Sequence, residues 1–169
     1  MRLFLASYLH PDLVTYLTGR ILYIDDAAVE MREAPFAQEE LKTVGEAAEV
    51  LVPVTVSQMA LADFRKELEL ADCVYVASGE TFRLLHALKS TGADQLLVDA
   101  VRAGKLYAGS SAGALRHYLQ RNTSYEHTSD LSSIALWLSL SLFSWPLPVA
   151  AGIGQPRCRS AVLYWPDVS

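Results

Sequence analysis

The stretch Lys105-Leu-Tyr-Ala-Gly-Ser-Ser-Ala-Gly113 is the part of the sequence that is most informative about the fold. It is typical of a short buried strand that passes through Gly-x-Ser-x-Gly into a helix, with Ser111 at the centre. A serine at the tip of such a turn lies on strained backbone, and its neighbours must be small so that the chain segments can pass. The amide of Ala112 is then a candidate donor to a developing oxyanion. The alternative is a turn that only joins a strand to a helix, and the flanking strand and helix patterns favour the functional interpretation.

A second stretch, Val74-Tyr-Val-Ala-Ser-Gly-Glu-Thr-Phe-Arg-Leu-Leu85, has the same order of strand, tight turn and helix. Together with residues 101–113, it resembles the peptidase E family, cytoplasmic serine dipeptidases related to cyanophycinases, over the first 130 residues. That family has a glycine-rich turn followed by Asn-Thr-Phe-x-Leu-Leu, and then a Gly-x-Ser-Ala-Gly turn. This chain departs from the pattern at Ala77-Ser78-Gly79-Glu80, which replaces the family's run of glycines and Asn.

Segments typical of strands and helices alternate along the chain. Short apolar runs predict strands over 3–7, 21–24, 50–54 and 73–76. Amphipathic patterns predict helices over 11–17, 38–48, 57–70, 81–88 and 94–103, with Ser57 as the N-cap of the third. This alternation predicts a doubly wound α/β domain with a mostly parallel sheet. The resemblance implies the class I glutamine-amidotransferase-like kind, and functional turns are expected at the carboxyl ends of its strands.

Composition limits the class of protein. The 169 residues are 51% hydrophobic, which is enough for one domain with its own core. A formal net charge of −5 and the lack of a basic stripe disfavour nucleic acid and anionic membranes as partners. Cys73 and Cys158 do not make a disulfide framework, and residues 1–6 are too short for the apolar region of a signal peptide. We therefore expect a cytoplasmic protein.

The turn after Val76 carries the second candidate oxyanion donor. The resemblance implies that the amide of Gly79 has this role, and the alternative is a glycine required only for its positive φ. A carboxylate beside an oxyanion would oppose its charge, so we expect Glu80 to point away and cap the following helix. His86, between leucines in that helix, is expected to be a packed structural histidine.

The adjacent carboxylates of Asp25 and Asp26 are candidates for a metal site or for acid–base chemistry. No third ligand lies near them in the sequence, so they are better interpreted as strand-end and helix-cap residues. No metal and no cofactor are expected.

A nucleophilic serine needs a base and a carboxylate that orients this base. The resemblance places the acid in a turn rich in threonine and asparagine, which residues 122–130 are similar to. Asp130 and Glu126 are both candidates, and Asp130 is favoured because Thr128-Ser129-Asp130 is similar to the family's Thr-Asn-Asp.

The base is harder to assign. The family carries its histidine in a later Pro-His-Tyr-like segment, which has no counterpart here, because the histidines are His10, His86, His117 and His127. His117 lies almost two helical turns beyond Ser111 and is too far away. His127 is the candidate that remains, although it is adjacent in sequence to the candidate acids.

Residues 131–156 contain no charged residue. They are interpreted as a membrane segment, as a strand and loop in a subunit interface, or as the result of a departure from the family's reading frame. We favour the third. The chain is then a single domain over 1–169 in which 144–169 are an atypical end, truncated or frame-shifted. An alternative frame of the coding DNA should encode Pro-His-Tyr soon after Trp145. The apolar end also makes a homo-oligomer plausible.

These observations lead to one principal hypothesis. By the resemblance, the chain is a serine peptidase whose partners are small peptides with an N-terminal aspartate, with Ser111 as the nucleophile. One alternative is a catalytically impaired, peptidase-like binding protein that keeps the pocket without the triad. The other is an esterase-type hydrolase with a different acyl substrate.

Overall fold

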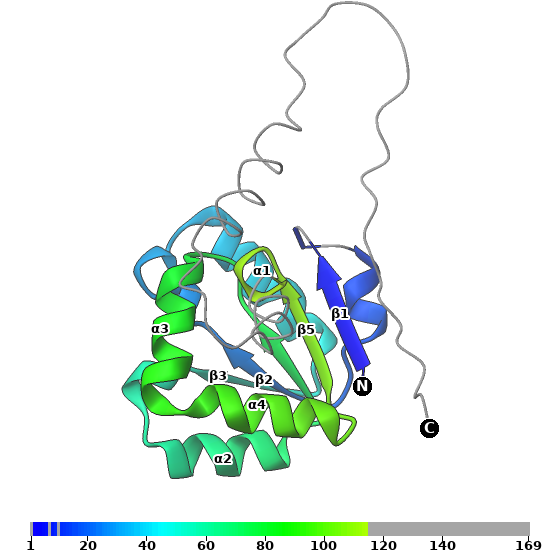
Figure 1. Cartoon of the computed structure of the whole chain (residues 1–169). Helices are drawn as coiled ribbons and strands as arrows, with labels where there is room; N and C mark the ends of the chain where they lie inside the picture. Colours follow the sequence, from blue (N-terminus) through cyan, green and yellow to red (C-terminus); the bar gives the residue numbers. More distant parts are fainter. Residues whose placement is uncertain (1, 7, 10, 115–169) are drawn as a thin grey trace, which may run out of the picture.

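A computed structural model describes residues 2–6, 8–9 and 11–114 of the chain (Figure 1). In chain order, its elements are β1 (Arg2–Ala6), the 3-10 helix η1 (Pro11–Thr15), β2 (Arg20–Ile24), η2 (Asp26–Met31), α1 (Pro35–Ala47), β3 (Val50–Val54), η3 (Val56–Gln58), α2 (Leu61–Leu70), β4 (Cys73–Val76), α3 (Thr81–Thr91), α4 (Ala93–Arg102) and β5 (Leu106–Ser110). Strands and helices alternate, as the sequence predicts.

The strands form a parallel sheet in the order β1-β5-β4-β2-β3. Its register pairs Val76 with Gly109 and Ala6 with Ser110. The carboxyl ends of β4 and β5 therefore lie side by side, and the turns that follow these strands leave the same edge of the sheet. A doubly wound parallel sheet places its functional turns at this edge.

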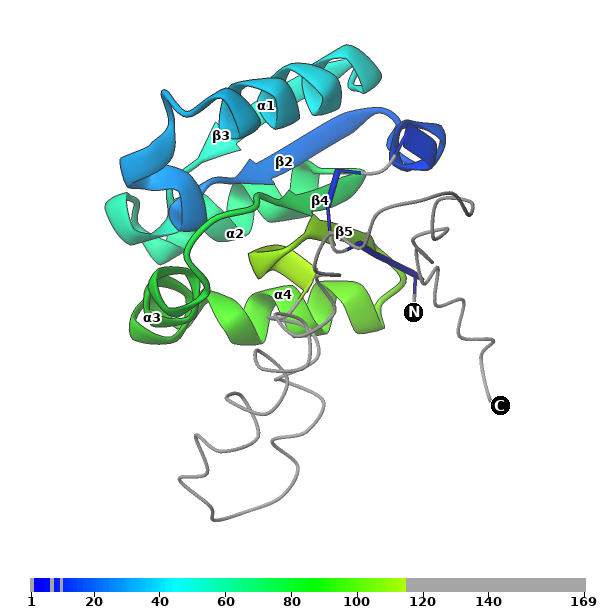
Figure 2. The ribbon, with the colours of Figure 1, turned by 90° about the horizontal axis from the view of Figure 1, so that it is seen from above.

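Helices cover both faces of the sheet (Figure 2). One core lies between the sheet and the helices α2, α3 and α4, and the other lies between the sheet and the elements η1 and α1. Alternate residues of β2 and β4 supply the two cores: Leu22, Ile24, Val74 and Val76 belong to the first, and Ile21, Tyr23, Cys73 and Tyr75 belong to the second. Since both faces are covered, the strands are continuous apolar runs. The predicted doubly wound α/β fold is confirmed.

The short helix predicted over 11–17 is present as the 3-10 helix η1. One local prediction differs from the structure. Ser57 is not the N-cap of a long helix, because it lies within η3, and α2 begins later with Ala60 as its N-cap residue.

The interpretations of residues 131–156, of the atypical end over 144–169 and of self-association concern residues outside the described part.

None of the helices that the structure describes combines the length and the apolar character that crossing a bilayer requires.

Candidate functional site

Strand β5 ends at Ser110, and the next residue has the unusual conformation that the sequence predicts. Ser111 has a φ of +48°, and it is the only described residue other than glycine with a positive φ. This conformation costs free energy in an L-residue, and strained residues of this kind cluster at functional sites. The amide of Ser111 donates to the carbonyl oxygen of Ala6 on β1 at 2.9 Å, and the residue itself is exposed. The serine is therefore held at the sheet edge and presented to solvent.

The glycines on either side of Ser111 are required by close packing. A Cβ atom on Gly113 would lie 2.4 Å from the carbonyl oxygen of Val76, and one on Gly109 would lie 2.9 Å from the carbonyl carbon of Gly113. The carbonyl oxygen of Gly113 also accepts a hydrogen bond of 2.7 Å from the buried hydroxyl of Tyr107. The start of the next helix thus passes directly over β4 and β5, which confirms the predicted steric reason for small residues here.

The turn after β4 is also built around a glycine. Gly79 has a φ of +143°, and a Cβ atom there would lie 2.2 Å from the carbonyl oxygen of Ala27. The same oxygen accepts a hydrogen bond from the amide of Glu80 at 2.8 Å. The backbone therefore requires glycine at this position, whether or not its amide takes part in chemistry.

A cavity of about 560 Å³ joins these two turns. Ser111, Gly79 and Ser78 line it together with side chains from the amino-terminal third of the chain, namely Tyr8, Leu9, Met31, Phe36, Glu39 and Glu40. The structure therefore brings together two residues, Ser111 and Gly79, that the sequence analysis selected separately. Ala112, which directly follows Ser111 in the chain, is buried.

Neither candidate oxyanion donor has an acceptor for its amide in the part of the chain that the structure describes. Within the described residues, the amides of Gly79 and Ala112 donate to no other group, although the adjacent amides of Glu80 and Ser111 each have an acceptor. Ala112 begins a helical segment, and the first amides of a helix have no partner within it. The oxyanion-hole role of these amides remains a prediction.

The side chain of Glu80 is accounted for by an ion pair. It is exposed, makes no capping hydrogen bond to α3, and lies 3.5 Å from the guanidinium group of Arg83. Glu80 is exposed and occupies the N-cap position of α3, as predicted, although its side chain makes no hydrogen bond to the helix. His86 is exposed rather than packed, because the buried stripe of α3 consists of Leu84, Ala87 and Leu88.

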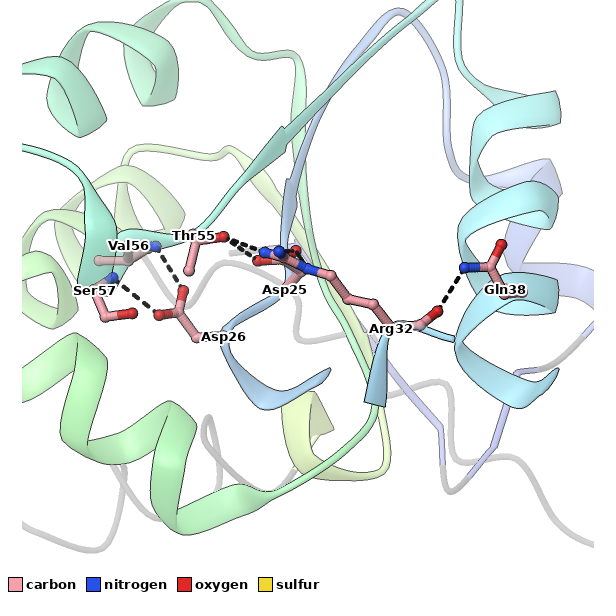
Figure 3. Close-up of polar contacts among 7 residues, drawn as sticks. All are labelled: Asp25, Asp26, Arg32, Gln38, Thr55, Val56 and Ser57. Atoms are coloured by element: carbon pink, nitrogen blue, oxygen red, sulfur yellow. Dashed lines mark hydrogen bonds and ion pairs between the residues drawn. The ribbon is translucent and has the colours of Figure 1, made fainter. Parts of the chain in front are cut away.

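The adjacent residues Asp25 and Asp26 have structural partners (Figure 3). The buried carboxylate of Asp26 accepts hydrogen bonds from the amides of Val56 (2.6 Å) and Ser57 (2.9 Å), at the start of η3. Asp25 forms an ion pair of 2.6 Å with Arg32. No three His, Cys, Asp or Glu residues of the described part are grouped as a metal site would require. The two carboxylates are strand-end and cap residues, as predicted.

A network that the sequence analysis missed lies beneath the cavity. Glu40 is only 2% exposed, and its Oε2 accepts a hydrogen bond from the amide of Ser78 at 2.9 Å. Its Oε1 accepts from the hydroxyls of Tyr75 (2.5 Å), Ser78 (2.8 Å) and Ser110. The hydroxyl oxygens of Ser78 and Ser110 are 2.7 Å apart. Burial, together with the charge and the hydrogen bond of Glu40, raises the pKa of Tyr75 well above its usual value.

One signal for this network was present in the sequence. Glu40 lies on the buried stripe of α1 with Ala37 and Val44, at the helical spacing of three and four residues. A glutamate within an apolar stripe needs buried hydrogen-bond partners. The sequence could not identify those partners, because they lie 35 to 70 residues further along the chain.

The predicted acid and base lie outside the described residues. Glu126, His127 and Asp130 all belong to the segment 115–169, and so does His117. Among the described residues, no histidine lines the cavity beside Ser111. The assignment of an acid and a base therefore remains a prediction.

Comparison with known proteins identifies relatives of this chain. The model of peptidase family S51 matches residues 6–145. An uncharacterized peptidase of Listeria monocytogenes is 35% identical over 124 residues, which are 73% of this chain and 60% of the relative. A peptidase E of Streptomyces coelicolor is 54% identical over 46 residues, which are 27% of this chain and 19% of the relative.

A solved structure has the same fold. It is a crystal structure from Listeria monocytogenes, whose protein is assigned to peptidase E, and it matches with a TM-score of 0.61 and 30% sequence identity. The match covers 67% of this chain and 59% of the other. The chain thus spans about 60% of the length of the first of these relatives. These matches confirm the resemblance to peptidase E, and the chain belongs to peptidase family S51.

Proposed function

We propose that this chain is a cytoplasmic serine peptidase that hydrolyses small peptides with an N-terminal aspartate, with Ser111 as the nucleophile. The observation that carries the proposal is the strained backbone of Ser111, which presents this serine beside Gly79 in a cavity at the carboxyl edge of the sheet. The same arrangement of a serine on a sharp strand-to-helix turn occurs in hydrolases that form an acyl-enzyme.

The chemistry follows from the positions of the two turns. The Oγ atom of Ser111 forms a bond to the carbonyl carbon of the scissile peptide, its proton passes to a base, and the carbonyl electron pair moves onto oxygen. The amides of Gly79 and Ala112 donate to this oxyanion. The tetrahedral intermediate collapses with release of the protonated amine, and water then hydrolyses the ester. His127 is the candidate base, oriented by Asp130 or Glu126.

The described lining of the cavity bears on the substrate. Glu39 and Glu40 supply the only charged side chains of this lining, and both are acidic. A free amino terminus is attracted to such a lining, which fits a dipeptide substrate better than an internal peptide bond. An aspartate side chain is repelled by it, so the proposed preference for aspartate rests on the family resemblance and not on this lining.

A specific observation also favours an impaired, peptidase-like binding protein. The family's later histidine has no counterpart in this sequence, and no described histidine lines the cavity. Without its base, a triad serine loses most of its rate advantage. Such a protein would retain the cavity and hold a peptide without cleaving it.

Labelling with a fluorophosphonate distinguishes these two functions. An activated Ser111 forms a bond to phosphorus and expels fluoride, so we expect intact mass spectrometry to find one adduct on the wild type and none on Ser111→Ala. Ser90→Ala, at an exposed serine of α3, is the matched control and should keep the adduct. A folded wild type without an adduct would contradict the peptidase and support the binding protein.

A substrate panel tests the preference. Dipeptides that begin with aspartate should be hydrolysed faster than those that begin with asparagine. Asparagine is the matched comparison because it has the same shape as aspartate without the charge. Faster hydrolysis of the asparagine series would contradict the aspartate preference. Turnover of simple esters without turnover of any dipeptide would support the esterase-type hydrolase.

A further inference from the structure

A single carboxyl group contacts both turns that line the cavity. Two of the hydrogen-bond donors to Glu40 are Ser78, which directly precedes Gly79, and Ser110, which directly precedes Ser111. The carboxyl group itself comes from α1, which packs on the second core of the sheet and belongs to neither turn. Glu40 therefore connects three separate parts of the fold at one point.

The contacts are placed where they control the orientation of the Gly79 amide. Ser78 is held twice by Glu40, through its backbone amide at 2.9 Å and its hydroxyl at 2.8 Å. The carbonyl carbon of Ser78 is bonded to the nitrogen of Gly79, so fixing Ser78 restricts the peptide plane that carries this amide. On the other side, the hydroxyl of Ser110 ties the last residue of β5 to the same carboxyl group.

We propose that Glu40 is a positioning residue of this site, whose carboxyl group fixes the Gly79 turn relative to Ser111. Glu40 acts through Ser78 and Ser110, and it does not contact the reacting atoms. The chemical consequence rests on the proposed function, because it requires Ser111 to be a nucleophile. The fixing of the two turns does not depend on that function and can be measured separately.

Whether the reaction becomes slower or faster in Glu40→Gln distinguishes a positioning role from an effect of charge. A negative charge beside the cavity opposes an oxyanion, so removing a charge should accelerate attack if charge is all that matters. Glu46 lies on the same helix as Glu40, is exposed and is not among the residues that line the cavity. If Glu40 acts by position, then Glu40→Gln slows the reaction, whereas Glu46→Gln, the same substitution away from the cavity, does not.

The first readout is the rate at which a fluorophosphonate labels Ser111, because the phosphoryl oxygen of this probe occupies the place of the oxyanion. Glutamine has the shape of glutamate but presents an amide group to one of the donors of this network. We expect the maximal labelling rate of Glu40→Gln to fall about tenfold or more, with less than about a twofold change in the half-saturating concentration of the probe. Ser78→Ala, which removes one donor and keeps Glu40, should show a smaller loss of the same kind. Equal or faster labelling of Glu40→Gln would overturn the proposal.

The second readout is amide hydrogen exchange followed by mass spectrometry, which needs no activity. In Glu40→Gln we expect exchange to rise at least about fivefold in peptides covering 76–81 and 108–113, with peptides of β2 and α2 unchanged. Glu46→Gln should match the wild type throughout. Unchanged exchange in both segments, or a uniform rise over the chain, would overturn the proposal. If the wild type is not labelled but the selective rise is seen, then the peptidase function fails and the fixing of the turns by Glu40 stands.

Discussion

Asp26 and Glu40 are two buried carboxyl groups with different kinds of partner. Asp26 is 0% exposed and accepts hydrogen bonds from two backbone amides, those of Val56 and Ser57 (Figure 3). Glu40 is 2% exposed and accepts from one backbone amide and from three side-chain hydroxyls. Asp26 is not among the residues that line the cavity beside Ser111, whereas Glu40 is.

This difference shows that burial alone does not mark a functional carboxyl group. Both groups need hydrogen-bond partners because an unpaired buried carboxylate is very costly. The partners of Asp26 are backbone groups that begin a short helix, so its role is to direct the chain after β3. The partners of Glu40 adjoin the candidate nucleophile and the candidate oxyanion donor, so its role concerns the site.

The largest effect on stability is expected for Asp26→Ala. This substitution leaves the amides of Val56 and Ser57 without their acceptor. The Val56 bond is buried and the Ser57 bond is partly buried, and an unsatisfied buried donor costs about 1–3 kcal/mol. We expect the free energy of unfolding, measured with urea, to fall by about 2–4 kcal/mol. Asp26→Asn keeps one acceptor oxygen and should lose about half as much. The separation of roles would be wrong if Asp26→Ala left stability unchanged, or if the still-folded Asp26→Asn lost fluorophosphonate labelling as Glu40→Gln does.

The next largest effect is a loss of stability at alkaline pH, caused by two buried tyrosines near Glu40. Burial first, and then the charge of Glu40, raises the pKa of both Tyr75 and Tyr23 above the usual value of 10.0. The unfolded chain therefore loses these protons first, and it binds fewer protons than the folded protein above about pH 10. The contribution to stability is complete below that pH and declines as pH rises, by about 1.4 kcal/mol per pH unit for each tyrosine.

Urea unfolding at a series of alkaline pH values measures this slope. In Tyr75→Phe the slope should be shallower by the contribution of one tyrosine, about 1.4 kcal/mol per pH unit. In Asp26→Asn the slope should be the same as in the wild type. Comparing slopes between variants removes the contributions of other groups that titrate in this range. Equal slopes for the wild type and Tyr75→Phe would contradict the assignment.

The smallest effect is expected at the carboxylate adjacent to Asp26 in the sequence. Asp25 pairs with Arg32 at 2.6 Å, and the side chain of Arg32 is 47% exposed. Because exposed ion pairs contribute little, Arg32→Ala should lower the free energy of unfolding by less than about 1 kcal/mol, and salt should reduce the difference further. If Arg32→Ala lowered the free energy of unfolding as much as Asp26→Ala does, then exposure would not explain the difference between the contributions of Asp25 and Asp26 to stability.

Much of the fold was determined by local features of the sequence. The apolar runs of the strands, the small residues around Ser111 and the glycine at position 79 act through neighbouring residues and backbone sterics, which a single sequence displays. The order of these segments predicted the parallel sheet, and with it the placement of both turns at one edge. The predictions that Ser57 caps a helix and that His86 is packed were wrong, because they depended on where a helix begins and which of its faces is buried.

Only the tertiary structure decided which polar groups meet. The sequence places Glu40 on the buried face of a helix, but it does not show that Tyr75, Ser78 and Ser110 surround its carboxyl group. Those contacts join residues that lie far apart in the chain, and the stacking of α1 on the sheet brings them together. Local pattern therefore determined the strained serine, whereas long-range packing determined the carboxyl group beneath it, because a hydrogen-bond partner is chosen by position in space and not by distance along the chain.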